Sequence, residues 1–282
     1  MSIVLSHYQV TPALQAKRGG TDSVEISLDL GISLTRAQLT PDFLYFPSFP
    51  EFPLFWDDAE KIARDENSCF VLDANGISKI KTFSELTNRA YSLYPTASAP
   101  TMLVAGFPMH RIKDSDPRRD TVAKVKTLAP IAGSVLDTAT GLGYTAMEMA
   151  KTARQVVTLE LDPAAQEIAR QNPWSRDVFD NPKIEQRMGD SFEIVPTFAD
   201  NSFDAILHDP PTMSLAGDLY SEEFYRELFR VLKRGGKLFH YIGDPESKLG
   251  ANLTRGVFER LLRAGFKRVT KHADAFGGVA VK

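Results

Sequence analysis

The second half of the chain alternates short apolar runs with amphipathic stretches, the pattern of a parallel sheet covered by helices. We expect strands at 134–138, 155–160, 184–188, 203–208 and 236–242, and helices near 144–152, 163–171, 191–196, 222–232 and 254–264. Segments 266–271 and 276–281 have no helix between them, so they must pair as an antiparallel hairpin. The predicted sheet therefore has five parallel strands followed by a hairpin.

The first hundred residues show shorter alternations that favour a small β-rich domain. Residues 1 to about 20 predict a frayed leader or a short helix that ends at Gly19-Gly20. Residues 23–39 alternate like strands around a turn at Gly31, and 43–55 are too rich in Phe and Pro for a long helix. A short helix is expected at 57–65, then a hairpin of 68–72 with 77–83 around Asn75-Gly76.

Residues 101–128 carry six Lys and Arg against three Asp and Glu, a net charge of +3. They end in a predicted helix at 120–128, whose apolar side carries Val122, Val125 and Leu128. We therefore divide the chain into a β-rich domain (1–100), a basic linker and helix (101–128) and a cofactor domain (129–282). The basic run is either a solvated linker or a local contact for RNA.

The composition narrows the class of protein. Of 282 residues, 43% are hydrophobic and 24% charged, and the net charge is −3, which excludes a general nucleic-acid coat. Cys69 is the only cysteine, so we expect no internal disulfide and no metal site. With neither the basic start of a signal peptide nor an apolar run of about 18 residues, we expect a cytoplasmic protein without membrane contact. The composition leaves the oligomeric state open.

The sequence SVLDTATGLGYTA, residues 134–146, is a strand, a glycine turn and the start of a helix. It fits the dinucleotide fingerprint G-x-G-x-x-A and also the loop D-x-G-x-G-x-G, with Ala139 in place of the first glycine. Asp137 would repel a pyrophosphate but attract the ammonium and sulfonium of S-adenosylmethionine. We therefore expect S-adenosyl-L-methionine as the cofactor, lying along Asp137, Ala139, Gly141 and Gly143.

Two further acids follow strands of the predicted sheet. Glu160 stands 19 positions after Gly141, near the spacing of an acid that binds ribose hydroxyls, and its alternative is an exposed acid at a strand end. After the third strand, Asp190 either accepts the adenine amino group or caps the helix that starts at Ser191. We assign Glu160, Asp190 and Ser191 to cofactor binding.

The fourth strand ends in His208-Asp209-Pro210-Pro211-Thr212, next to the glycine loop by switch-point geometry. The Asp-Pro-Pro run resembles the motif of methyltransferases that act on planar amino groups, in which the acid and the first proline carbonyl accept the two N–H bonds. We name Asp209, Pro210 and, in the linker, His110 as catalytic candidates. Thr212 stands where that family has an aromatic residue, so stacking would fall to Tyr220, Phe107 or Tyr241. We expect His208 to be a packing residue, whereas Trp174 either lines the adenine side or anchors a core.

Several stretches together resemble a family of predicted class I methyltransferases known mainly from archaea: VLDTATGLGYTA, VVTLELDP, FDAILHDPPT and the closing GFKRVTKHADAFGGVAVK. The resemblance runs from about Leu103 to the last residue. It implies an α/β, Rossmann-like class I sheet, S-adenosylmethionine as donor, and N-methylation of a base in RNA, with an rRNA cytosine N4 as one candidate.

Other functions remain open. An aminopropyltransferase of the spermidine-synthase type has a similar layout and uses decarboxylated S-adenosylmethionine, but its glycine loop ends in an acid that GLGYTA lacks. A small-molecule amine methyltransferase fits the same motifs. A non-catalytic module would bind S-adenosylmethionine without turnover.

Overall fold

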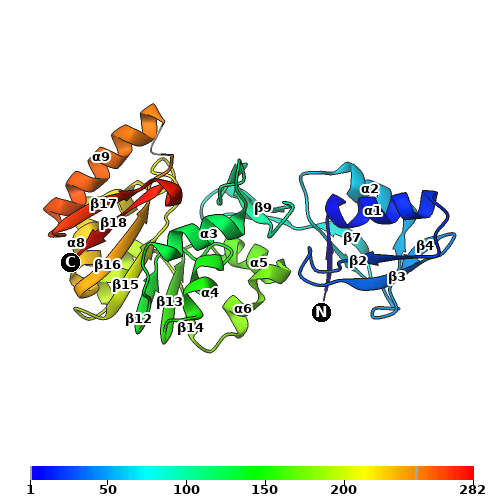
Figure 1. Ribbon diagram of the computed structural model, residues 1–282, viewed down its shortest axis with the longest axis horizontal. Coiled ribbons are helices and arrows are strands. Elements are labelled where there is room, and N and C mark those ends of the chain that lie inside the picture. Colours follow the sequence, from blue (N-terminus) through cyan, green and yellow to red (C-terminus); the bar gives the residue numbers. More distant parts are fainter. Residues whose placement is uncertain (1, 245–246) are drawn as a thin grey trace. The chain divides into compact units, whose positions relative to one another are not determined.

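The computed structural model describes residues 2–244 and 247–282, and the chain divides into two compact units (Figure 1). The first unit comprises Met1–Arg118 and Ala164–Arg176, and the second comprises Arg119–Pro163 and Asp177–Lys282. Among the described residues, no helix is long and apolar enough to span a bilayer.

The second unit is built on a seven-stranded sheet in the order β14-β13-β12-β15-β16-β18-β17. Its strands are β12 (Ser134–Asp137), β13 (Gln155–Glu160), β14 (Ile184–Met188), β15 (Phe203–His208), β16 (Leu232–Tyr241), β17 (Arg268–His272) and β18 (Gly277–Val281). The first five are parallel, and β18 is antiparallel to both β16 and β17. The predicted α/β fold class, with its closing hairpin, is confirmed.

Strand β16 begins at Leu232, four residues before the predicted 236. Leu232 pairs with Phe203, and the register then shifts before Lys237 pairs with Ala205. The extra residues include Gly235, which has φ +77°. A glycine-containing irregularity of this kind carries no apolar alternation, so the sequence pattern did not reveal it.

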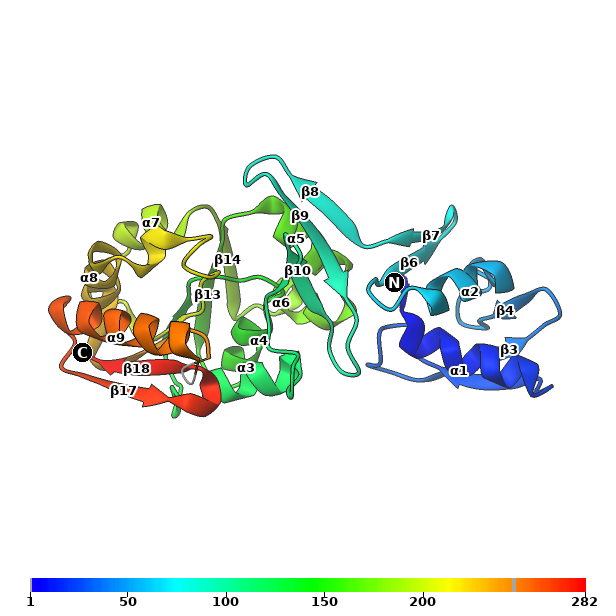
Figure 2. The same cartoon turned by 90° about the horizontal axis from the view of Figure 1, so that it is seen from above.

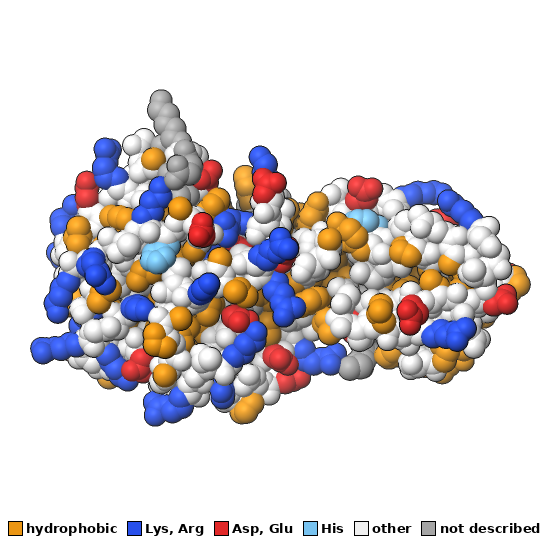
Figure 3. Space-filling model, in the orientation of Figure 1, with side chains coloured by type: hydrophobic (Ala, Val, Ile, Leu, Met, Phe, Trp, Pro, Cys, Tyr) orange, Lys and Arg blue, Asp and Glu red, His pale blue; other side chains and the backbone are white. Residues whose placement is uncertain are grey.

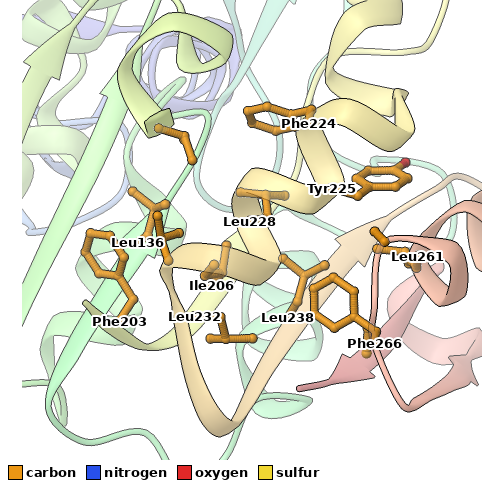
Figure 4. Packing of buried hydrophobic residues seen from close by; sticks show 14 of the residues in the cluster. Leu136, Phe203, Ile206, Phe224, Tyr225, Leu228, Leu232, Leu238, Leu261 and Phe266 are labelled. Carbon is orange, nitrogen blue, oxygen red and sulfur yellow. The ribbon is translucent and has the colours of Figure 1, made fainter. Parts of the chain in front are cut away.

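Helices cover both faces of this sheet. They are α3 (Pro117–Lys126), α4 (Tyr144–Ala150), α6 (Arg176–Asp180), α7 (Ser191–Ile194), α8 (Glu222–Val231) and α9 (Lys248–Arg263), with 3-10 turns η2 (Val195–Thr197), η3 (Gly217–Tyr220) and η4 (Ala273–Ala275). Because side chains alternate along a strand, Leu136 lies in the core on one face, which also contains Leu228 of α8 and Leu261 of α9 (Figure 4). Its neighbour Val135 packs with Met149 of α4 on the other face. Helices α8 and α9 lie side by side (Figure 2).

The first unit is β-rich, as expected for the N-terminal portion. Its strands are β1 (Ile3–Leu5), β2 (Ser23–Ile26), β3 (Thr35–Leu39), β4 (Phe43–Tyr45), β5 (Leu54–Phe55), β6 (Phe70–Asp73), β7 (Gly76–Lys79), β8 (Lys81–Ser84), β9 (Arg89–Tyr94), β10 (Thr101–Val104) and β11 (Phe107–Pro108). They form the sheets β1-β6-β7, β2-β3-β4-β5 and β11-β10-β9-β8. The helical elements are α1 (His7–Arg18), α2 (Trp56–Arg64), α5 (Pro163–Gln171) and η1 (Pro173–Ser175). The expected hairpin at Asn75-Gly76 is formed by β6 and β7.

In the N-terminal half the structure decides between two alternatives for residues 1 to about 20 and corrects one expectation for α3. Ile3–Leu5 is a buried strand paired with β6, and Ser6 begins α1 with a capping box, so this stretch is a helix rather than a frayed leader. Val122, placed on the apolar side of its helix, is 40% exposed. The other two expected positions, Val125 and Leu128, are buried, and the buried side of α3 also carries Asp120 and Lys124, which pair with each other.

Residues 101–108, expected as part of a linker, form β10 and β11, and β10 pairs with β9. Residues 164–176, expected in the cofactor domain, group with the first unit. There the Trp174 indole donates to the Leu30 carbonyl at 3.0 Å, and the Thr82 hydroxyl donates to Glu167 at 3.0 Å. Of the two roles open for Trp174, the structure thus shows an anchor.

Two adjacent leucines of α9 test the core. Leu261 is fully buried beneath α8, whereas Leu262 is 49% exposed. We expect Leu261→Ala to lower the free energy of unfolding by about 2–5 kcal/mol, because it removes apolar contacts and leaves a cavity. Leu262→Ala is the matched control and should change it by about 0.5 kcal/mol or less. Denaturant unfolding measures both, and equal losses would contradict this packing.

Candidate functional site

The sheet topology brings two loops of the second unit together. Strands β12 and β15 are parallel neighbours, and Asp137 pairs in register with Leu207. The glycine loop after β12 and the Asp209-Pro210 segment after β15 therefore leave the same edge of the sheet from adjacent strands. In open α/β sheets this edge is where ligands bind.

Asp137 is fully buried at the end of β12. Its Oδ2 accepts a hydrogen bond from the Thr145 hydroxyl at 2.8 Å, and its Oδ1 lies 3.4 Å from the Ala139 amide nitrogen. Burial raises the pKa of Asp137 to about 7, because the interior disfavours its charged form. The carboxyl group is thus poised to become charged near neutral pH.

Glu160 is tied to the glycine loop. Its Oε2 accepts from the Gly141 amide at 2.8 Å, and its Oε1 accepts from the Asp162 amide at 3.0 Å. Burial raises the pKa of Glu160 to about 7 despite these hydrogen bonds. Glu160 is partly buried and bound to two backbone amides, so it is not the exposed strand-end acid that the sequence left open. Gly141 has φ +52°, a backbone conformation that glycine adopts readily.

The structure gives a reason for a glycine at position 143 that differs from the cofactor binding expected from the sequence. It caps α4 with φ +76°, and a Cβ there would lie 2.6 Å from Val178 Cγ2. Close packing against α6 therefore accounts for this glycine before any cofactor is considered. A role in cofactor binding for Gly143 stays a prediction.

Asp190 and Ser191 anchor the short helix α7. The Asp190 carboxylate accepts from the Phe192 amide at 2.8 Å, so it caps the helix, one of its two predicted roles. The Ser191 hydroxyl donates to the Thr138 carbonyl at 2.6 Å, which connects α7 to the glycine loop. Contact of either residue with adenine stays a prediction.

Asp209 lies in an ion-pair cluster that the sequence analysis missed. The Lys124 Nζ is 2.6 Å from Asp209 Oδ2 and 2.7 Å from Asp120 Oδ2. The side chains of Lys124 and Asp120 are 1% and 0% exposed, but that of Asp209 is 17% exposed. Burial alone would lower the pKa of Lys124, but the charges of Asp209 and Asp120 outweigh it and raise the pKa. Asp120 and Lys124 stand four positions apart on α3, a helical pairing that could have been noticed.

The two prolines after Asp209 differ in their surroundings. Pro210 is buried, and within residues 2–244 and 247–282 no donor bonds its carbonyl oxygen. The Pro211 carbonyl accepts from the Tyr220 hydroxyl at 3.1 Å. Of the aromatics considered for stacking, Tyr220 is buried, and Lys124 Nζ lies 4.3 Å from the ring centroid of Tyr241. The third, Phe107, belongs to the first unit.

His208 and His240 are packing residues. The His208 Nε2 lies 2.9 Å from the Leu219 carbonyl, which only accepts, so Nε2 carries the proton and Nδ1 accepts from the Thr138 hydroxyl at 2.7 Å. In His240 the hydrogen bonds point the other way, from Nδ1 to the Tyr241 carbonyl and from the Tyr225 hydroxyl to Nε2. Burial lowers the pKa of His208 to about 4, and that of His240 well below its usual value. Both rings are therefore neutral at physiological pH.

His110 belongs to the first unit, where its Nδ1 lies 2.9 Å from the Thr101 hydroxyl. The structure describes each unit by itself, so a catalytic role for His110 stays a prediction. No group of three or more His, Cys, Asp or Glu side chains that could hold a metal ion occurs in the described part of the chain.

The sheet order, the glycine loop and the flanking helices define a class I methyltransferase fold, and residues 136–240 match the family described as "Methyltransferase domain". The chain is 39% identical over 287 residues to the uncharacterized protein MJ1233 of Methanocaldococcus jannaschii, a match that spans 100% of this chain and 98% of that protein. The chain therefore belongs to the same family as MJ1233.

A second group of relatives matches only part of the chain. A protein of Aeropyrum pernix named polyamine aminopropyltransferase is 29% identical over 144 residues, which are 49% of this chain and 44% of that protein. A crystal structure of spermidine synthase in complex with the transition-state analogue AdoDATO superposes with a TM-score of 0.59 at 21% identity, covering 72% of this chain and 74% of that one. This structural likeness supports the fold.

The methyltransferase fold implies a donor of the S-adenosylmethionine type, and the loop residues fit one. A carboxylate has about four lone-pair sites, so Asp137 and Glu160 retain acceptor capacity beyond the hydrogen bonds described. The buried Asp137 and the partly buried Glu160 would suit the ammonium and the ribose hydroxyls of such a donor. Whether the donor is S-adenosylmethionine or its decarboxylated form depends on the reaction.

Gly141 provides a test of donor binding. We expect Gly141→Val to abolish or strongly weaken S-adenosylmethionine binding, because a β-branched residue disfavours φ +52° and would displace the amide that bonds Glu160. Gly217→Val is the control, since a Cβ at Gly217 meets nothing within 4 Å. Calorimetric titration measures both, and unchanged affinity in Gly141→Val would move the donor site elsewhere.

The pKa values of about 7 give donor binding a pH dependence. Asp137 and Glu160 are protonated below their raised pKa values and accept hydrogen bonds fully only above them. We expect the affinity for S-adenosylmethionine to rise between about pH 6 and pH 8, and Glu160→Gln to reduce both the affinity and this rise. Glu185→Gln, on β14, is the control. An affinity independent of pH in the unaltered protein would contradict the assignment.

Proposed function

We propose that the protein is an S-adenosyl-L-methionine-dependent N-methyltransferase that acts on a planar amino group. A base in RNA is the proposed acceptor class, and the N4 amino group of an rRNA cytosine is the first candidate. The observation that carries the proposal is the partly exposed Asp209, followed by the Pro210 carbonyl, directly after the strand that lies next to β12 and its glycine loop.

Asp209 and Pro210 would act as acceptors for the two N–H groups of the amine. An amine in this orientation directs its lone pair toward the methyl group, and two acceptors enrich the nitrogen in electron density. When bound, the donor supplies an electrophilic methyl group on a sulfonium. The nitrogen forms its bond to carbon as the carbon–sulfur bond breaks, the electron pair stays on sulfur, and the nitrogen then loses one proton to water.

The proposal of an RNA acceptor rests on the Asp-Pro-Pro run and on the resemblance to base-amine methyltransferases. Figure 3 shows Lys and Arg side chains on the visible face of the second unit, with Asp and Glu between them. Such a mixed surface suits local phosphate contacts better than a continuous coat. The chain's net charge of −3 agrees with that choice.

Aminopropyl transfer to an aliphatic amine is the second candidate. It is favoured by the partial matches to proteins named polyamine aminopropyltransferase. The same acid after β15 would then face a polyamine nitrogen. The donor would be decarboxylated S-adenosylmethionine.

Two measurements separate the candidates. The purified protein is incubated with each donor, once with RNA and once with putrescine or spermidine, and the products are identified by mass spectrometry. In parallel, RNA nucleosides are compared between a strain lacking the gene and the intact strain. Loss of one methylated nucleoside supports the proposal. Transfer of an aminopropyl group to a polyamine replaces it with the second candidate, and donor binding without any product would indicate a binding module.

Asp209→Ala tests the role of the acid. We expect turnover to fall at least about tenfold, because one oriented polar contact to the reacting amine is lost, while donor affinity stays nearly intact. Asp218→Ala, an exposed acid in η3, is the control. Normal methyl transfer by the Asp209 variant would remove Asp209 from the acceptor site.

A further inference from the structure

Lys124 and Asp120 form a buried charge pair that has no role in the reaction proposed above. Two carboxylates and one ammonium meet there, and only Asp209 reaches the surface. A buried ion pair is a poor source of stability, because desolvation of the charges offsets much of their attraction. This arrangement therefore calls for a role other than stabilising the fold.

We propose that Lys124, oriented by Asp120, keeps Asp209 ionised as a hydrogen-bond acceptor and so restricts the substrate to amines that are uncharged at neutral pH. This inference rests on the proposed function. Lys124 and Asp120 are positioning residues in it, because both act through Asp209. Planar amino groups conjugated to a ring are such amines, whereas aliphatic amines such as polyamines are protonated.

The geometry holds the ammonium in place from three sides. Asp120 lies one helical turn before Lys124 on α3, Asp209 follows β15, and the Tyr241 ring of β16 lies 4.3 Å from Nζ. A cation over an aromatic face is attracted by the ring. Because Val125 of α3 shares one apolar core with Ala205 of β15 and Phe239 of β16, the position of the Asp209 carboxylate is fixed before a substrate arrives.

A carboxylate held by an ammonium is a weak base. The nitrogen of a planar amine attacks with its own lone pair and loses a proton afterwards, so an acceptor is sufficient. An aliphatic ammonium has a pKa near 10 and must first give up a proton to a base. Asp209 paired with Lys124 cannot efficiently take that proton.

Other titratable groups near Asp209 are already engaged. Asp137 accepts from Thr145, and the Tyr220 hydroxyl donates to the Pro211 carbonyl. Burial raises the pKa of Tyr220, and the charge of Asp209 raises it further, so this hydroxyl stays protonated. The Tyr241 ring lies beside Lys124, and the neutral ring of His208, the residue before Asp209, lies 4.4 Å from that of His240.

The decisive measurement is the titration of the Asp209 carboxyl by carbon NMR in protein labelled at the aspartate carboxyls. Asp209→Asn identifies its signal, and S-adenosylmethionine binding verifies the fold of each variant. In Lys124→Met we expect Asp209 to titrate about 1–3 pH units higher, since an opposite charge at this distance shifts a carboxyl by that amount. Lys126→Met, an exposed lysine on the same helix, is the matched control and should leave the titration unchanged.

Asp120→Asn gives the opposite sign and serves even where Lys124→Met does not fold. Without the competing carboxylate the ammonium pairs with Asp209 alone, so Asp209 should titrate at a lower pH. A merely structural pair would lower the melting temperature in both variants without moving the titration. An unmoved titration in Lys124→Met, or an unmoved or upward one in Asp120→Asn, overturns the inference whichever reaction the protein performs.

A second measurement follows the pH dependence of kcat/KM with the acceptor that the product analysis identifies. In Lys124→Met we expect the acid limb of the kcat/KM profile to move upward by the same 1–3 units, with activity recovering at high pH. Efficient turnover of a protonated aliphatic amine at neutral pH by the unaltered protein would contradict the proposed selectivity. That result would also reject planar-amine methylation, whereas the NMR titration would still report the Lys124–Asp209 coupling.

Discussion

The parallel pairing of β12 with β15 is the constraint on which the candidate site depends. It sets Asp137 beside Leu207, so that the loops after the two strands start at one edge, although nearly seventy residues of chain separate them. The strands are fixed from both faces by apolar side chains that alternate between two cores. The glycine loop and Asp209 are therefore positioned by strands that are buried between two apolar cores.

The second unit also places several ionisable side chains in buried or partly buried positions. Burial disfavours the charged forms of the Asp137 and Glu160 carboxyls, whereas the Asp209 carboxylate forms an ion pair with the Lys124 ammonium. One sheet edge thus holds two carboxyls that gain charge near neutral pH and a third that is paired with an ammonium. This division agrees with the proposed roles, in which the donor side responds to pH and Asp209 stays ionised on the acceptor side.

Much of the second unit could be predicted from the sequence, because its signals are local. The apolar runs of β12 to β15 gave their bounds to within a residue, and the absence of a helix between β17 and β18 required a hairpin. Asp209 and Glu160 were found from motif and spacing, although their roles remain to be tested. Lys124 was missed because one lysine in a basic segment looks like a solvated charge until its distant partner is placed against it. Ile3–Leu5 was missed because a three-residue strand carries too little periodicity to recognise.

The membership of residues 164–176 in the first unit has a consequence for how the molecule can be divided. The chain enters the second unit at Arg119, returns to the first at Ala164 and leaves it again after Arg176. A fragment ending at Arg118 would lack the indole that bonds the Leu30 carbonyl, and one beginning at Arg119 would carry α5 and η1 without their own unit. Each unit is thus assembled from two separate stretches of the chain, and no single cut of the chain yields either unit with all of its own residues and none of the other unit's.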